Sequence, residues 1–302
     1  MRRVIYSLIP IYLFAIYLYG LRLIWLSIFV FGAGILTEWI MEKRKNKKVS
    51  EAVLVTNLLL VLSLPPQTPW WIAVIGTVFA VLIGKEVYGG FGRNIFNPAI
   101  TGRIFIYITF ANIMTTGWIE PGNFGVDAVS SATPLALLRA GEEVSNLDLF
   151  LGFRAGSFGE SSILLISLAA VYLIWTKTAS WRIILSTFLS TAILTGALYW
   201  SGVDSALPPF QALMSGSLIF VTVFMATDPV SAPKKSSSQW FYGMIIGVTT
   251  VLVRTFSLFP EGTSFGVLMG NTFASLLDQI KLKKKVKSWI NKKKFIQLFS
   301  LL

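Results

Sequence analysis

The chain has 302 residues, of which 54% are hydrophobic and only 13% are charged, and its mean hydropathy is +0.69. This composition is typical of a helical protein that crosses a membrane several times, and it argues against a soluble domain. The sequence contains neither histidine nor cysteine, which excludes imidazole-ligated haem and thiolate-ligated iron–sulfur clusters. We therefore expect no protein-ligated metal, and any redox chemistry must come from an organic cofactor or from metals in partner chains.

A membrane-spanning helix needs about 20 mainly apolar residues. By this criterion the sequence predicts an all-α polytopic membrane protein with about ten transmembrane helices, and nine is the nearest alternative. The stretch that follows Arg2 and Arg3 is expected to be a retained first helix, because no small-residue cleavage site follows it. The predicted spans are 4–19, 23–40, 50–64, 70–84, 97–114, 161–176, 182–200, 209–226, 239–254 and 263–278.

The two halves of the sequence resemble each other weakly, which favours two inverted repeats of five helices each. In both halves an apolar helix ends near a proline, at Pro65 and Pro66 and again at Pro229, before an aromatic and then a glycine-rich segment. Such repeats commonly place a site near the midplane of the membrane. The single membrane domain, 1–302, divides into a first repeat at 1–114, a loop at 115–160, a second repeat at 161–278 and a basic tail at 279–302.

The distribution of lysine and arginine predicts the orientation of the chain, and it explains the net charge of +12 without nucleic-acid binding. With a cytoplasmic N-terminus and ten spans, 21 of the 26 basic residues fall on the cytoplasmic side, as the positive-inside rule requires. Both termini are then cytoplasmic, and the 115–160 loop lies on the outer face. The tail KLKKKVKSWINKKKF is expected to lie on anionic lipid, with protein docking as the alternative.

The stretch from Asp127 to Thr133 reads DAVSSAT and matches the pattern D-[GA]-x-[ST]-x-A-T. Flavin transferases attach FMN through its phosphate to the threonine hydroxyl of this pattern. A small-residue turn before the Thr133–Pro134 pair is the local alternative. The pattern predicts covalent FMN on Thr133, with Ser130, Ser131 and Ala132 as neighbouring cofactor-binding residues.

Two further blocks contain candidate binding residues. In GKEVYGGFGRNIFNPAITGR, residues 84–103, Asn94 and Asn97 can place two amides on one side of a helical turn, where a flavin edge would satisfy them; close helix packing is the alternative. In FRAGSFGESS, residues 153–162, Arg154 and Ser157 can help to hold a flavin phosphate. The alternative there is local: Ser161 or Ser162 caps the next helix, with Glu160 beside its N-terminus.

Acidic residues near membrane spans are costly enough to be candidates for an ion path, although acids at the interface can simply be solvated. The candidates are Glu86, Asp228 and Asp278.

With MATDPVSAP at 225–233 and RTFSLFPEG at 254–262, these blocks resemble the flavinylated membrane subunits of the Rnf and Nqr respiratory complexes, RnfD and NqrB, over most of residues 50–280. Those subunits usually have glycine at the position of Ser131. RnfD is the better match, because Thr-Pro-Leu follows the motif and the long N-terminal extension of NqrB is absent.

The resemblance implies an electron-transfer subunit of an ion-translocating oxidoreductase in a prokaryotic plasma membrane. It implies covalent FMN on Thr133, attached by a flavin transferase, and a second, non-covalent flavin such as riboflavin near Asn94 and Asn97. The partners would be membrane subunits and subunits that carry flavin or iron–sulfur centres. The alternative from a different class is a solute channel or secondary transporter without a redox role.

Overall fold

The computed structural model describes residues 1–122, 131–257, 259 and 262–279. Within these ranges every regular element is a helix, which confirms the prediction of an all-α protein. Asp127, Ser130 and the tail from 280 onward lie outside the described residues.

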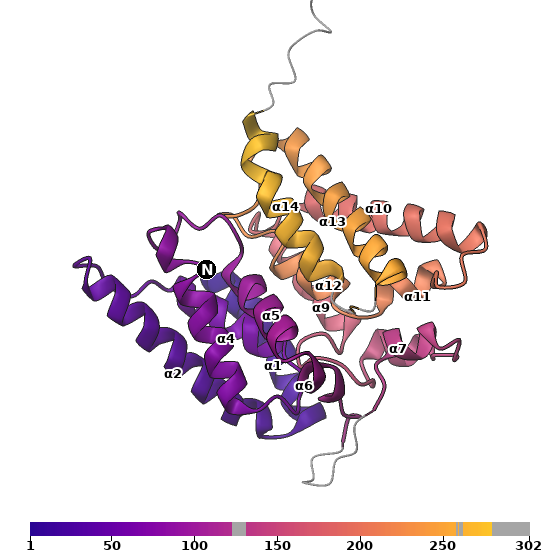
Figure 1. Ribbon diagram of the computed structural model, residues 1–302, viewed down its shortest axis with the longest axis horizontal. Coiled ribbons are helices and arrows are strands. Elements are labelled where there is room, and N and C mark those ends of the chain that lie inside the picture. The colour runs from indigo at the N-terminus through magenta and orange to yellow at the C-terminus, as the bar shows by residue number, and fades with distance from the viewer. Residues whose placement is uncertain (123–130, 258, 260–261, 280–302) are drawn as a thin grey trace, which may run out of the picture.

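The chain forms two groups of helices, drawn in indigo to purple and in orange to yellow in Figure 1. The first group is α1 (Arg2–Tyr19), α2 (Arg22–Lys43), α3 (Ala52–Leu62), α4 (Trp70–Leu82), the 3-10 turn η1 (Glu86–Tyr88), α5 (Pro98–Thr109) and α6 (Ala111–Thr116). The connecting segment contains α7 (Pro134–Arg139) and α8 (Asn146–Leu151). The second group is α9 (Ile163–Trp175), α10 (Trp181–Trp200), α11 (Pro209–Met214), α12 (Leu218–Phe224), α13 (Ser236–Phe256) and α14 (Gly262–Gln279).

Each predicted span contains helix, but ten continuous transmembrane helices are not confirmed. In the described part of the chain, four helical stretches are long and apolar enough to cross a membrane alone: α1, α2, Trp70–Tyr88 and α10. The predicted span 97–114 changes direction at Phe110, and 209–226 is interrupted between α11 and α12. Gly216 lies in that second interruption with φ of 64°, a backbone conformation that favours glycine.

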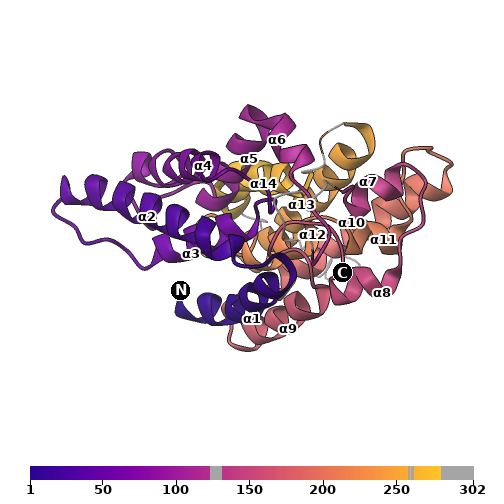
Figure 2. The same ribbon diagram turned by 90° about the horizontal axis from the view of Figure 1, so that it is seen from below.

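The same order of packing occurs in both groups. In the first group α2 packs on α4 and α4 packs on α5, and in the second α10 packs on α13 and α13 packs on α14. The two groups meet where α1 lies against α9 and where α5 lies against α14, as Figures 1 and 2 show. Asn97 at the start of α5 crosses this boundary, because its backbone N–H donates to the Asn271 side chain of α14 over 3.1 Å.

Glycines allow α13 to approach α10 closely. A Cβ atom at Gly243 would lie 2.8 Å from the Ile183 carbonyl oxygen, and one at Gly247 would lie 2.8 Å from the Thr187 carbonyl oxygen. Small residues at such contacts let helix backbones approach in a membrane, where packing rather than water exclusion holds helices together.

Helix α3 ends inside the protein, and the segment before α9 satisfies its last carbonyl groups. The backbone N–H of Gly159 donates to the Leu62 carbonyl over 2.7 Å, and Ser157 Oγ donates to the Ser63 carbonyl over 3.1 Å. Because the terminal carbonyls of a helix have no partner within the helix, this contact allows α3 to stop in an apolar interior.

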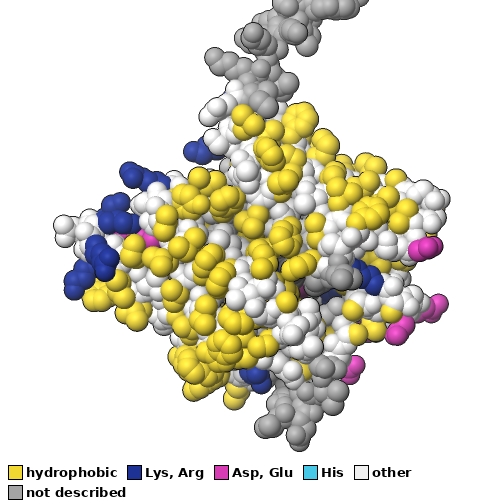
Figure 3. All heavy atoms as spheres, viewed as in Figure 1, with side chains coloured by type: hydrophobic (Ala, Val, Ile, Leu, Met, Phe, Trp, Pro, Cys, Tyr) yellow, Lys and Arg dark blue, Asp and Glu magenta, His cyan; other side chains and the backbone are white. Residues whose placement is uncertain are grey.

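The surface is apolar across its middle and charged at its ends. Figure 3 shows Lys and Arg gathered on the side where α2 ends, and Asp and Glu mostly on the opposite side. Exposed residues such as Trp175, Ile193 and Val171 belong to the apolar surface, which suits a lipid environment.

Candidate functional site

Thr133 is the N-cap of α7. Its Oγ1 accepts a hydrogen bond from the backbone N–H of Ala136 over 3.3 Å, and Pro134 occupies the first helical position, which suits proline. The side chain of Thr133 is only partly buried, because it faces a cavity. Thr133 therefore has a structural role as a helix cap, which differs from the small-residue turn expected from the sequence, and its hydroxyl remains accessible.

The cavity beside Thr133, called here the Thr133 cavity, has a volume of about 30 Å³. Three segments that are distant in the sequence form its wall: the start of α7, the FRAGSFGESS block and the interruption between α11 and α12. Trp118 completes the wall, and its carbonyl accepts from the backbone N–H of Ser131 over 2.9 Å. Ser131 is partly buried and Ala132 is exposed, so both border the site without lining it.

Arg154 brings a buried positive charge to the wall of the Thr133 cavity. Its guanidinium donates to the main-chain carbonyls of Glu160 and Ser161 over 2.8 and 3.2 Å, and the Tyr19 hydroxyl donates to the carbonyl of Arg154. These carbonyl partners fix the side chain but carry no net charge. An anionic group in the cavity would therefore meet a positive charge that is already in place.

Glu160 also lines the Thr133 cavity, but it does not act at the helix terminus as the sequence suggested. Its carboxylate forms an ion pair of 2.6 Å with Arg103 of α5, and the Arg103 guanidinium lies over the Tyr107 ring. Ser162 caps α9, as the local alternative expected, and accepts from the backbone N–H of Leu165 over 3.3 Å. The ion pair of Arg103 and Glu160 could not be predicted from the sequence, because the two residues belong to different blocks.

Ser157, predicted as a cofactor contact, does not line the Thr133 cavity. Its hydroxyl is buried against the end of α3.

A second cavity, called here the Asn94 cavity, lies between the two groups of helices and has a volume of about 80 Å³. Asn94, Asn97, Lys85, Thr178 and Asp228 are among its lining residues. Its walls thus come from the GKEVYGGFGRNIFNPAITGR block, the turn between α9 and α10, and the end of α12. This volume is below the ~300–1,000 Å³ that is usual for small-molecule sites, so the walls would have to move apart to admit a ligand of that size.

The two asparagines do not form the pair of amides on a helical turn that their spacing predicted. Asn94 precedes the helix in irregular backbone, and its Nδ2 donates to the Phe96 carbonyl over 3.0 Å. Asn97 is the N-cap of α5: its Oδ1 accepts from two backbone N–H groups, and its Nδ2 donates to the Met225 carbonyl over 3.1 Å. Asn97 is thus occupied by structural bonds, whereas the side-chain oxygen of Asn94 is available to a ligand.

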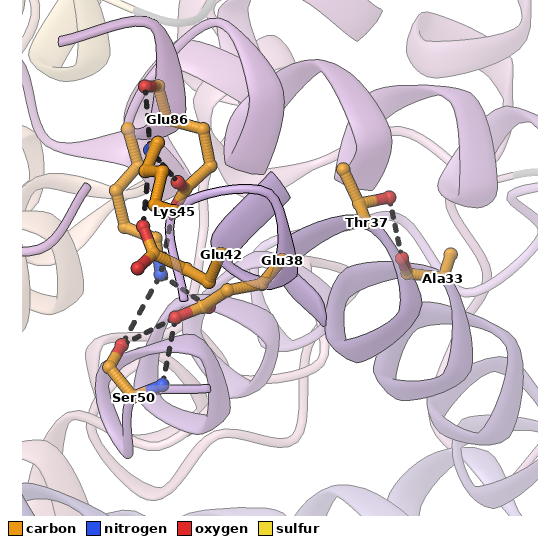
Figure 4. A network of polar contacts seen from close by, with 8 residues as sticks. Ala33, Thr37, Glu38, Glu42, Lys45, Ser50 and Glu86 are labelled. Atoms are coloured by element: carbon orange, nitrogen blue, oxygen red, sulfur yellow. Dashed lines mark hydrogen bonds and ion pairs between the residues drawn. The ribbon is translucent and has the colours of Figure 1, made fainter. Parts of the chain in front are cut away.

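Glu86 belongs to a buried ionic network, shown in Figure 4. Lys45 connects two of its carboxylates, with Nζ 2.8 Å from Glu86 and 3.1 Å from Glu42. The hydrogen bond that Lys45 donates to Glu86 raises the pKa of Lys45 above its ordinary value.

Glu38 is the deeper carboxylate of this network. It forms an ion pair with Lys85 and accepts from the backbone N–H and the hydroxyl of Ser50 over 2.9 and 2.7 Å. The sequence analysis missed Glu38 and Glu42, although two acids near the end of an apolar helix were a signal by the same criterion that selected Glu86.

The other two ion-path candidates have separate surroundings. Asp228 lies in the wall of the Asn94 cavity, where burial raises the pKa of its carboxyl although hydrogen bonds from Ser231 lower it. Asp278 accepts from the backbone N–H groups of Lys234 and Lys235 over 2.7 and 3.1 Å, so it joins the end of α14 to the start of α13. The three candidates therefore do not share one cluster of contacts.

An apolar helical frame that encloses polar cavities and buried ion pairs defines a multi-pass membrane protein. The chain belongs to the NQR2, RnfD, RnfE family, whose model matches residues 1–287.

The relatives come from two kinds of complex. A subunit of the Na(+)-translocating NADH-quinone reductase of Azotobacter vinelandii is 36% identical over 85% of this chain and 66% of its own length. The corresponding subunit of Chromohalobacter salexigens is 37% identical over 85% of this chain and 64% of its length. The chain thus spans just under two thirds of these relatives. A subunit of the ion-translocating oxidoreductase complex of Actinobacillus succinogenes is 31% identical over 91% of this chain and 90% of its own length.

Proposed function

We propose that this chain is a membrane electron-transfer subunit of an ion-translocating oxidoreductase complex and that it carries FMN on Thr133. The observation that supports this most directly is the position of the Thr133 hydroxyl, which faces a cavity containing the buried charge of Arg154. The relatives, named as subunits of ion-translocating reductases, point to the same function.

In this proposal each residue of the Thr133 cavity has a separate task. Thr133 Oγ1 forms the phosphoester, and Arg154 offsets the charge of the phosphate. Trp118 provides an aromatic wall, and Arg103 keeps the carboxylate of Glu160 paired so that it does not repel the phosphate. When bound, the flavin supplies one-electron transfer, and the protein supplies binding and orientation.

We further propose that the Asn94 cavity holds a second, non-covalent flavin, such as riboflavin. Its position between the groups of helices is one where such ligands bind, and its volume of about 80 Å³ requires the walls to move apart on binding. Asn94 is the residue that would recognise the ring edge, because Asn97 is bonded to α5 and to Met225.

The assignment to an Rnf-type complex, rather than to Nqr, is also part of this proposal. It is supported by the relative from Actinobacillus succinogenes, which matches along nearly the whole of both chains. The partners would be membrane subunits and flavin or iron–sulfur subunits, and a flavin transferase would act on Thr133. Glu86, Asp228 and Asp278 remain the proposed acids of an ion path.

The function can be tested by producing the chain together with a flavin transferase, denaturing it and illuminating the gel with ultraviolet light. Covalent FMN survives denaturation, so the band should fluoresce, and the band made without the transferase serves as the control. A band that stays dark in both samples would contradict the proposal and favour a channel or transporter without a redox role.

A further inference from the structure

A basic groove opens beside the Asn94 cavity, between the turn that joins α9 to α10 and the segment before α13. Its volume is about 600 Å³, and its lining includes the cationic side chains of Lys177, Arg182 and Lys234. None of the described residues that line it is acidic. The groove therefore presents charge of one sign to whatever occupies it.

Local contacts hold the wall of this basic groove in place. The Arg182 guanidinium lies over the Trp181 ring at 5.0 Å, and Trp181 meets the Trp240 ring edge-on at 5.9 Å. Ser180 Oγ donates to the side chain of Gln239 over 2.8 Å, which ties the start of α10 to α13. The two helices and the guanidinium of Arg182 are thus positioned without a ligand.

Two acids, Asp228 and Asp278, lie near the groove, but neither lines it. The carboxylate of Asp278 accepts from the backbone N–H groups of Lys234 and Lys235, and the Lys235 side chain donates to the carbonyl of Asp278. In addition, the first turn of α10 lines the groove, and its N-cap makes no side-chain capping bond. The start of a 20-residue helix favours an anion.

We infer that the basic groove binds the headgroup of an anionic phospholipid. Two features favour a lipid over a soluble anion. First, exposed apolar residues such as Val171, Leu185 and Leu189 continue from the groove along α9 and α10, which gives the acyl chains a surface to follow. Second, exposed tryptophans flank the groove, as they do at the interface between a membrane and water.

The charge of the groove also selects the kind of lipid. The cytoplasmic leaflet contains anionic lipids, and each nearby Lys or Arg contributes about 1 kcal/mol to the attraction. The groove lies on the side that the basic residues assign to the cytoplasm. Phosphatidylglycerol, whose headgroup has a net negative charge, is therefore a suitable probe, and zwitterionic phosphatidylcholine is its counterpart.

The inference can be tested with the full chain purified in detergent. Native mass spectrometry would follow the binding of dioleoylphosphatidylglycerol and dioleoylphosphatidylcholine in separate titrations. We expect the first lipid to bind more tightly. We also expect the triple variant Lys177→Gln, Arg182→Gln, Lys234→Gln to weaken its binding on the order of 100-fold at low salt, because three cationic contacts are lost.

The matched control is the triple variant Arg44→Gln, Lys47→Gln, Lys48→Gln. It removes one arginine and two lysines from another exposed loop with the same expected orientation, and it should change the affinity less than twofold. The single variant Arg182→Lys keeps the charge and should retain most of the binding, which separates loss of charge from misfolding.

Three results would overturn the inference. The first is equal affinity for the two lipids. The second is unchanged phosphatidylglycerol binding in the groove variant; if that variant instead loses co-purifying subunits, the groove is a protein interface. The third is binding of inorganic phosphate alone that the groove variant abolishes, which would assign the groove to a soluble anion.

Discussion

Thr133 has one observed role and one proposed role, and the two can be tested separately. Its Oγ1 accepts from the backbone N–H of Ala136 as a helix cap, and the same hydroxyl oxygen is the proposed attachment atom. Substitution by valine or alanine would remove both roles together. Loss of the flavin in such a variant could then be mistaken for a consequence of a disordered α7.

The variant Thr133→Asn separates the two roles. Asparagine is a good N-cap residue but has no hydroxyl, so in-gel fluorescence should disappear while the helix cap is retained. Thr133→Ser keeps both the cap and a hydroxyl and is the matched control for folding. Fluorescence that persists in Thr133→Asn, measured in the same gel, would show that the flavin is attached elsewhere.

The two asparagines should respond differently to substitution by leucine. Asn94→Leu should release an acid-extractable flavin from the purified protein and leave stability nearly unchanged, because Asn94 makes one local bond. Asn97→Leu removes the cap of α5 and strands the Met225 carbonyl, which should cost about 1–3 kcal/mol for the stranded group alone.

Extractable flavin per protein and the thermal unfolding temperature are the two measurements for this comparison. Unchanged flavin content in Asn94→Leu, with normal unfolding, would exclude Asn94 as a flavin ligand.

Because Glu38 and Lys85 form a buried ion pair, removing one partner should lower the free energy of unfolding by a large amount. Lys85→Met leaves the Glu38 carboxylate buried without its ion-pair partner and should destabilise the protein by about 3–5 kcal/mol. The double variant Lys85→Met, Glu38→Gln removes both charges and should recover much of the loss. Thermal unfolding followed by circular dichroism would measure both, and equal instability of the two variants would contradict the prediction.

The residues that could be identified from sequence were those in local patterns. Thr133 and Arg154 lie on one cavity, as their motifs suggested. The partner of Glu160 could not be identified, because Arg103 is in another block and only the tertiary fold brings the two together. For Asn97, the residue after it is the decisive clue: proline at the first helical position indicates an N-cap rather than a ligand.

At the scale of elements, interruptions were harder to predict than helices. An apolar average over 209–226 hides the break between α11 and α12, because Ser215, Gly216 and Ser217 are few among many apolar residues. Regular helices such as α1, α2 and α10 agree closely with their predicted ranges, since each has a sustained apolar composition and evident ends.

The close contact between α10 and α13 predicts that alanine will destabilise the protein much more at Gly243 in α13 than at Gly32 in α2. Gly243→Ala would bring a methyl group against the Ile183 carbonyl and should destabilise the protein by roughly 1–3 kcal/mol, as overpacking does. Gly32→Ala in α2 meets nothing within 4 Å and should be neutral or slightly stabilising. Thermal unfolding in detergent measures both, and similar values for the two variants would show that α10 and α13 can separate at little cost.

At the scale of the whole molecule, the inverted repeat stays a prediction. The matching order of packing, α2–α4–α5 and α10–α13–α14, is what such a repeat requires. It is clearer which loops lie on the same side of the molecule. The Asn94 cavity is lined by residues from several of them: Met1, Lys85, Thr178 and Asp228. These residues lie in the loops that the charge pattern assigned to one side.

Absolute orientation can be measured with single cysteines, since the chain has none of its own. Glu142→Cys in the exposed connecting segment should react with a membrane-impermeant maleimide in intact spheroplasts. Lys47→Cys, which is also exposed, should react only after permeabilisation. The reverse pattern would invert the orientation and remove the Thr133 segment from the face where its flavinylation is proposed.

The packing of α1 against α9 affects the order in which the helices can pack during synthesis. Helix α1 is synthesised first, but its neighbour begins only at Ile163, and Arg3 donates to the Thr176 carbonyl at the far end of that neighbour. At ~5–20 residues per second, α1 must wait roughly 8–30 seconds for this partner. During that interval α1 can pack on α2 and α3, while lipid covers the face that later meets α9.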